Sequence, residues 1–284
     1  MKRYLLPVYA GINGQYDSEE KRYKFKVDFD NNTSDDVVKF IEPYYRQSRI
    51  DNYTYWFGYS FNDGQSTPRR DEFIEFMKHV QPIRLADPDD EWSEHVYTDD
   101  NITEEELSEM LYRSMNRIGL DSRCVDTIVY PESKSSNLVG MIVKLLSSGM
   151  PHVPAIKEVE VLKASPAEIQ FDFDAFHKDI ESGNLIVPDF VTDDYIENMM
   201  NDIHRSDSFS LRRSVHPVSL RPYVSGFYKH TDATFAISKS DVVLIVDDFG
   251  TSGTTIRELI RVIRSINTEC EIFIFTLMGN RRAK

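Results

Sequence analysis

Apolar and polar residues alternate along residues 22–30, where polar or charged residues separate four apolar side chains: Tyr23, Phe25, Val27 and Phe29. This period of two predicts a β-strand with one buried face. A second strand is predicted over residues 53–61, where aromatic residues are frequent and the turn sequence Asn62-Asp63-Gly64 follows. The early part of the chain therefore contains strands of the half-buried kind.

Two short helices are predicted in the same part of the chain. Ser34 is a suitable N-cap for a helix over residues 35–42, and Pro43 would end it. Residues 72–80 predict the second helix. Together these elements predict an aromatic-rich α+β module over residues 1–98. The acidic segment at residues 87–91 is either a linker to the rest of the chain or a solvated loop within one domain.

From about residue 101 the pattern changes to alternating helices and strands. Thr103 and Glu106 form a capping box for a helix that ends near Gly119. Strands are predicted at residues 125–130, 156–162, 242–246 and 272–277. Helices are predicted between them at residues 137–147 and 254–266. Such alternation is typical of an α/β core with a mostly parallel sheet and helices on its faces, here over residues 99–284.

A long insertion, residues 164–240, interrupts this alternation. Its first half is acidic and predicts helices at about 172–181 and 193–203. Residues 209–230 contain no Asp or Glu but several basic side chains: Arg212, Arg213, His216, Arg221, Lys229 and His230. Closure over an anionic ligand, pairing with the acidic half of the insertion, or docking of a partner would each explain this charge.

Composition narrows the class of protein. The formal net charge of −14 disfavours nucleic-acid binding, since a polyanion would be repelled over most of the surface. No stretch approaches the ~20 apolar residues that a membrane-spanning helix needs. Cys124 and Cys270 lack metal-type spacing and are interpreted as reduced thiols, so we expect a cytoplasmic protein without a membrane partner. A homo-oligomer is left open.

The most informative stretch is Asp241-Val-Val-Leu-Ile-Val-Asp-Asp-Phe-Gly-Thr-Ser-Gly-Thr-Thr-Ile256. Its apolar run predicts a buried parallel strand that delivers Asp247 and Asp248 to the edge of the sheet, where ligands of α/β proteins bind. The small residues that follow lead into a helix, whose first amides suit a phosphate. The same residue types also cap strands and helices for purely structural reasons.

This stretch resembles the phosphoribosyl pyrophosphate motif of type I phosphoribosyltransferases. The resemblance covers residues 243–248 and 251–255 and departs from the family pattern at Phe249, where a smaller aliphatic residue is usual. It implies that Asp247 and Asp248 accept hydrogen bonds from the ribose hydroxyls. It also implies that the 5′-phosphate is held by Thr251, Ser252, Gly253, Thr254 and Thr255.

A pyrophosphate-binding loop is expected after the strand at residues 125–130, because the family has one after its first core strand. The candidate donors are Ser133, Lys134, Ser135 and Ser136. Lys163 lies at the end of the next strand. Several members of the family have a basic residue near this position, which contacts the pyrophosphate. The structural alternatives are an ordinary capped turn for the loop and an edge lysine that keeps the sheet soluble.

The resemblance implies a transferase that moves ribose 5-phosphate from phosphoribosyl pyrophosphate to a nucleobase-like acceptor and releases pyrophosphate. Mg²⁺ would then bind near Asp247 and Asp248, directly or through water, and Arg212, Arg213 and Arg221 are the candidate catalytic residues of a closing insertion. Residues 1–98, the insertion or both would cover the acceptor. The alternative is a non-catalytic sensor or regulator that binds phosphoribosyl pyrophosphate or a nucleotide.

Overall fold

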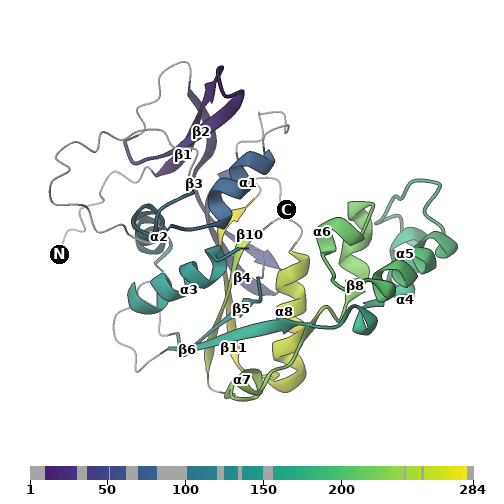
Figure 1. Ribbon diagram of the computed structural model, residues 1–284. Coiled ribbons are helices and arrows are strands. Elements are labelled where there is room, and N and C mark those ends of the chain that lie inside the picture. Colours follow the sequence, from purple (N-terminus) through teal and green to yellow (C-terminus); the bar gives the residue numbers. More distant parts are fainter. Residues whose placement is uncertain are drawn as a thin grey trace. The chain divides into compact units, whose positions relative to one another are not determined.

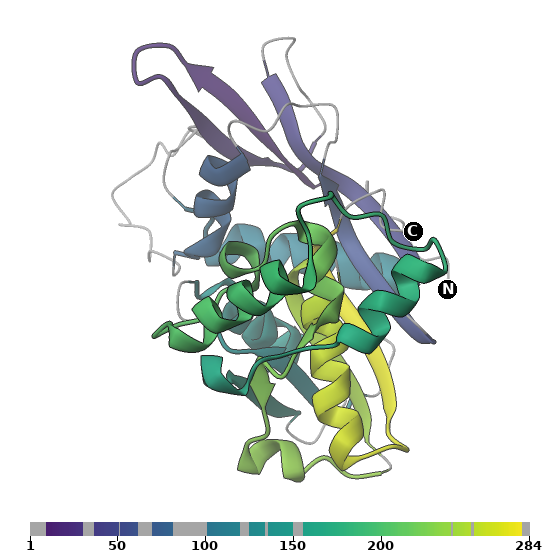
Figure 2. The same ribbon diagram turned by 90° about the vertical axis from the view of Figure 1, so that its right-hand side faces the viewer.

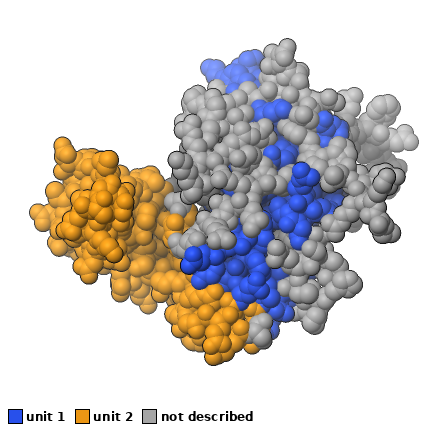
Figure 3. Space-filling view, turned by 180° about the vertical axis from the view of Figure 1, so that it is seen from behind, with its two compact units in different colours: residues 1–158, 242–251, 271–284 blue, residues 159–241, 252–270 orange. Residues whose placement is uncertain are grey.

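Residues 10–30, 37–50, 52–61, 70–81, 101–119, 125–133, 136–149, 156–239, 241–250 and 253–279 are described by a computed structural model of the chain. The chain divides into two compact units, coloured separately in Figure 3. Unit 1 comprises residues 1–158, 242–251 and 271–284, and unit 2 comprises residues 159–241 and 252–270. Each unit therefore contains segments that are distant in the sequence.

Unit 1 is built on one sheet with the strand order β2-β1-β3-β4-β11-β10-β5 (Figure 1). The parallel part consists of β4 (Tyr53–Phe61), β11 (Glu271–Gly279), β10 (Val242–Gly250) and β5 (Thr127–Pro131). The antiparallel part consists of β1 (Gly11–Asp17), β2 (Arg22–Asp28) and β3 (Val37–Ile50), coloured purple in Figure 2. The protein thus has an α/β fold with a mostly parallel central sheet, as predicted.

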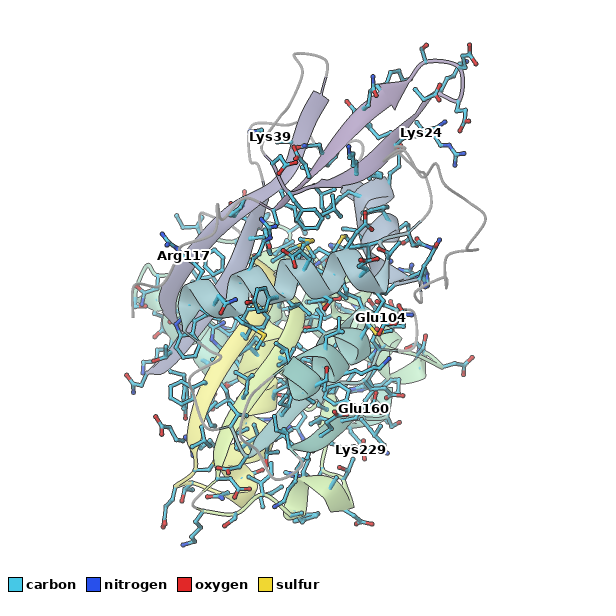
Figure 4. All side chains as sticks on the ribbon, turned by 90° about the vertical axis from the view of Figure 1, so that its left-hand side faces the viewer. Lys24, Lys39, Glu104, Arg117, Glu160 and Lys229 are labelled. Carbon is cyan, nitrogen blue, oxygen red and sulfur yellow. The ribbon has the colours of Figure 1, made fainter. Side chains whose placement is uncertain are left out.

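The helices among the described residues of unit 1 are α1 (Arg70–Lys78), α2 (Glu104–Ile118) and α3 (Leu138–Gly149). The predicted capping box of α2 is confirmed, since Thr103 Oγ1 accepts from the Glu106 amide at 3.2 Å and Glu106 accepts from the Thr103 amide at 2.9 Å. Gly119 ends this helix in the left-handed region, with a φ of 71°. Figure 4 labels Glu104 and Arg117, whose charges at the two ends of α2 oppose the helix dipole.

Helices α2 and α3 pack against each other and against the sheet. The apolar core of unit 1 lies between these helices and the sheet. It includes Leu107, Leu111, Ile142, Leu244 and Phe275, which are all 2% exposed or less. Burial of these side chains is the main force that holds the helices on the sheet.

The helix predicted over residues 35–42 is wrong, because the described part of this segment belongs to β3. Phe40 contacts the rings of Tyr23 and Phe25 on β2 and of Phe73 on α1, with centroids 5.0–5.7 Å apart, so tertiary packing decided the conformation. Pro43 lies inside the strand, next to a register shift between Pro43 and Arg46. A bulge is one of the few places where a sheet accepts proline, so Pro43 marks an irregularity and not a helix end.

The units of the structure do not coincide with the predicted boundary at residue 98. Strand β4 pairs in parallel with β11, with Tyr55 opposite Ile274 and Phe57 opposite Thr276. The first part of the chain thus supplies a strand to the parallel sheet as well as its antiparallel extension. The pairing joins segments more than 200 residues apart, which local patterns do not reveal.

Unit 2 holds the insertion and helix α8 (Thr254–Ile266). The predicted helices of the insertion are confirmed as α4 (Phe173–Glu181) and α5 (Asp193–Arg205). Two short antiparallel pairs join β6 (Lys157–Lys163) to β9 (Tyr228–Lys229), and β7 (Gln170–Phe171) to β8 (Val224–Ser225). The remaining elements are η2 (Pro166–Glu168), α6 (Leu211–Ser214), η3 (Val218–Tyr223) and α7 (Asp232–Phe235).

Several expectations concern residues outside the described ranges, namely the turn at residues 62–64, the linker at residues 87–91, and Cys124. Cys270 is a buried free thiol, and burial raises its pKa. In the part of the chain that the structure describes, none of the helices combines the length and the apolar character needed to cross a membrane.

Candidate functional site

Strand β10 lies between two parallel neighbours. It pairs with β11 along most of its length and with β5 from Val243 to Ile245. Residues 243–246 are completely buried, as expected for a central strand of a parallel sheet. The run of apolar residues stops at Asp247, so the first polar side chains of the strand appear at its carboxyl end.

Asp247 and Asp248 form a tightly coupled pair of acids. Asp247 is only 7% exposed, and Asp248 is half-buried. Asp247 Oδ1 accepts a hydrogen bond from the Asp248 amide at 3.0 Å, and Asp248 Oδ1 accepts one from the Phe249 amide at 2.7 Å. These bonds fix both carboxyl groups against the backbone, and a side-chain hydrogen bond joins the two carboxyl groups to each other.

Burial and the neighbouring charge of Asp248 raise the pKa of Asp247 well above its ordinary value. Burial also raises the pKa of Asp248, while the Phe249 amide and the positive charge of Lys78 act in the opposite direction. Two ionised carboxylates at such close range are unfavourable in a dry environment. A hydroxyl donor or a cation that binds here would therefore relieve an existing repulsion.

The acid pair lies where the order of the strands reverses. After β5 the chain returns as β6, whose first residue, Lys157, donates its amide to Asp126 O at 3.0 Å beside the start of β5. After β10 it returns as β11 on the other side of β10. In open α/β sheets, ligands bind beyond the carboxyl ends of the strands at such a switch point.

A second polar group lies beside Asp247 and was missed by the sequence reasoning. Thr276 on β11 is the register partner of Asp247, and its Oγ1 shares a 2.7 Å hydrogen bond with the hydroxyl of Tyr55 on β4. Burial raises the pKa of Tyr55 to about 12, and the charge of Asp247 adds to this effect. The sequence does indicate this polar group, because Thr276 is a polar residue within the otherwise apolar run of β11.

The loop after β5 contains the predicted pyrophosphate donors. Ser133 is half-buried, and Lys134 and Ser135 lie outside the described residues. Ser136 Oγ donates to Lys78 O at 2.8 Å and accepts from the Leu138 amide at 3.1 Å. The Ser136 hydroxyl is thus used within the fold, as a cap for α3 and a tether to α1, which is the structural alternative for this residue.

The turn that was predicted to bind phosphate is described from Gly253 onward. Gly253 is the N-cap of α8, with a φ of 71° and a ψ of 5°, in the left-handed region that favours glycine. Helix α8 begins at Thr254, which is buried, and Thr255 is half-buried. Thr251 and Ser252 lie outside the described residues. The helix start is confirmed, and phosphate binding there stays a prediction.

The predicted cations belong to unit 2. Lys163 is exposed at the end of β6, opposite Tyr228 of β9. Arg213 is exposed in α6, whereas Arg221 Nε in η3 donates to Val215 O at 3.3 Å. The structure describes the backbone of Arg212 but not its side chain. Of the predicted side chains, unit 1 brings together Asp247 and Asp248; the roles of the basic residues stay predictions.

The acid pair fits Mg²⁺ but not a closed metal cage. Among the described residues, no group of three or more His, Cys, Asp or Glu side chains is arranged to hold a metal ion. Mg²⁺ usually keeps several waters and binds through one or two carboxylates together with phosphate oxygens of a substrate. Two hard oxygen donors with mutual repulsion suit such an ion once a phosphorylated ligand completes its shell.

Comparison with models of known protein families found no match, and a search of curated proteins found no significant similarity. The function of this chain is therefore inferred from its residues and from the geometry of its fold.

Proposed function

We propose that the carboxyl end of β10 binds the ribose 5-phosphate part of phosphoribosyl pyrophosphate. The observation that carries this proposal is the buried pair Asp247 and Asp248, held by backbone amides at the switch point of a parallel sheet. Two adjacent carboxylates match the two adjacent hydroxyls of a ribose, each of which donates a hydrogen bond. The left-handed Gly253 and the helix after it suit a phosphate.

The proposed activity is transfer of the phosphoribosyl group to a nucleobase-like acceptor. A ring nitrogen of the acceptor forms a bond to the anomeric carbon as the bond from that carbon to pyrophosphate breaks. Asp247 and Asp248 orient the ribose and stabilise the positive charge that develops on it. Bound Mg²⁺ would neutralise charge on the leaving pyrophosphate.

Binding tests the first half of the proposal. We expect the protein to bind phosphoribosyl pyrophosphate with Mg²⁺ in calorimetry, and Asp247→Asn or Asp248→Asn to weaken binding by about tenfold or more, the usual effect of losing a charged hydrogen-bond partner. Glu271→Gln is the matched control. Glu271 is an exposed acid at the start of β11, five residues before Thr276, the register partner of Asp247. If the wild-type protein does not bind, the proposal is wrong.

Turnover tests the second half. Release of pyrophosphate, measured with a panel of purine and pyrimidine bases, would establish the transferase. Retained binding without turnover on any base would instead support the non-catalytic sensor, since the same ribose site serves both functions.

A further inference from the structure

A hollow on the surface of unit 2 lies between helix α5 and the chain around α6, both green in Figure 1. Its volume is about 400 Å³. Tyr195, Asn198 and Asp202 line its α5 wall, and Ser214 and His216 line its α6 wall. The Tyr195 hydroxyl donates to His216 O at 2.9 Å, so a hydrogen bond holds the two walls next to each other.

An exposed apolar side chain lies beside each wall. Phe190 is 59% exposed, and its ring contacts the ring of Tyr195 with centroids 5.5 Å apart. Val218 follows His216 by two residues and is 55% exposed. Single exposed apolar residues are common on protein surfaces and need no explanation. Two of them on opposite sides of one hollow are the arrangement expected of an interface that buries both.

The two walls belong to segments of opposite charge. Residues 189–202, which include most of the α5 wall, contain five acids and no lysine or arginine. Residues 209–230, which include the α6 wall, contain four lysines or arginines and no acid. The surface is therefore complementary in charge to itself, once one copy is turned so that each segment faces the other.

Pairing of these charges within one chain is the alternative explanation. Asp202 lines the hollow, and Arg213 precedes Ser214, which lines it as well. Both side chains are exposed, and within the described part of the chain neither of them forms an ion pair or a side-chain hydrogen bond. The opposite charges on the two sides of the hollow are thus left for a partner. Pairing within the chain would also leave Phe190 and Val218 exposed.

We propose that this surface, formed by the two walls with Phe190 and Val218, binds a second copy of the chain. A two-fold axis that runs along the hollow, between its walls, sets the α5 wall of each copy against the α6 wall of the other. The apolar side chains are then buried near the centre, and opposite charges meet on both sides. A different protein with a basic segment would match only the α5 wall, whereas a second copy matches both.

Sedimentation velocity tests the proposal. We expect the wild-type protein to change from monomer to dimer as its concentration rises through the micromolar range, which suits an interface of modest area. Phe190→Asp and Val218→Asp each place a charge in the apolar centre and should raise the dissociation constant by about tenfold or more. Phe235→Asp is the matched control, because Phe235 is 63% exposed but lies on α7, away from α5 and α6 in Figure 1.

An exchange of charges tests the two-fold arrangement itself. Asp202→Lys alone and Arg213→Glu alone should each weaken the dimer by about tenfold, because like charges then face each other twice in every homodimer. A mixture of the two variants should associate as tightly as the wild-type protein, since each facing pair is again of opposite sign. Recovery in the mixture also shows that both variants are folded.

Three results would overturn the inference. A wild-type protein that stays monomeric throughout the micromolar range has no such interface, and if it binds an oligolysine peptide instead, the surface serves a basic partner. A dimer that Phe190→Asp and Val218→Asp leave unchanged has its interface elsewhere. A mixture that associates as weakly as either charge variant alone excludes the two-fold arrangement. The proposed function is tested separately, because none of these measurements depends on binding of phosphoribosyl pyrophosphate.

Discussion

The carboxyl end of β10 in unit 1 and the start of α8 in unit 2 each bury a carboxylate, and their surroundings are opposite. Glu258 on α8 is 4% exposed and accepts from Arg261 at 2.8 Å and from the Gly226 amide at 2.7 Å. Asp247 is almost as buried, but its neighbour is a second carboxylate. Among the described residues, no salt bridge compensates Asp247.

This difference is the one we expect between a structural acid and an acid that binds a ligand. A buried carboxylate with a guanidinium and an amide is satisfied, so Glu258 stabilises the packing of α8 in unit 2. Gly226, which donates this bond, has a φ of 80°, in the left-handed region that favours glycine. A buried pair of acids costs folding free energy unless something binds it. We therefore expect the acid pair of β10 to destabilise the ligand-free protein, and a bound ligand to offset this loss of folding free energy.

The largest effect is expected for Glu258→Ala. Removal of the buried carboxylate from its pair with the half-exposed Arg261 should lower the free energy of unfolding by about 2–3 kcal/mol, because Arg261 and the Gly226 amide lose their acceptor. Urea unfolding measures this change. Glu269→Ala, which removes an exposed pair with Lys239, should cost less than about 0.5 kcal/mol. Equal effects of the two substitutions would contradict a structural role for Glu258.

A smaller loss is expected for Tyr55→Phe, about 1–2 kcal/mol, since Thr276 would keep a buried hydroxyl without its 2.7 Å partner. The pKa of Tyr55 is raised to about 12, above its ordinary value of 10.0, so the folded protein holds this proton more tightly than the unfolded chain. The resulting stability is fully present below pH 10 and is lost as the pH rises from about 10 to 12.

Urea unfolding of the wild-type protein and of Tyr55→Phe at several alkaline pH values tests the predicted loss of stability between pH 10 and 12. Wild-type protein should lose more stability than Tyr55→Phe between pH 10 and 12. Parallel curves for the two proteins would show that the Tyr55 hydroxyl is not held neutral by its surroundings.

The smallest and most diagnostic change is expected for Asp247→Asn, which should make the ligand-free protein more stable by about 1 kcal/mol, or ~2–4 °C in Tm. Asparagine keeps the acceptor for the Asp248 amide and removes one charge of the pair. The raised pKa means that folding favours protonated Asp247, so its ionisation destabilises the fold as the pH rises above the carboxyl's ordinary value of 3.8.

The stabilisation by Asp247→Asn should therefore be present at pH 7 and disappear at low pH, where the wild-type carboxyl is neutral in both the folded and the unfolded state. Thermal melts across this pH range give the measurement. A destabilised variant at pH 7 would mean that Asp247 resembles Glu258, and the comparison between the two regions would not hold.

Local patterns in the sequence determined much of this protein. The capping box of α2, the strand and two acids of β10, and the helix over residues 254–266 were predictable because each depends on neighbouring residues. Alternation of helices and strands also determined the α/β class with its mostly parallel sheet. The candidate acids were found for the same reason, since strand and site are continuous in the chain.

Only the tertiary structure decided which distant segments surround the acid pair. Residues 37–42 became part of a strand because Phe40 packs against the rings of its neighbours, which outweighed a helical pattern with a good N-cap. Pairing of β4 with β11 brought Tyr55 to Thr276, and two hydrogen bonds between Asn137 and Val80 joined the loop after β5 to the end of α1. These contacts join segments 57 to 221 positions apart, and such contacts form through sheet pairing and burial, which leave no periodic signal in the sequence.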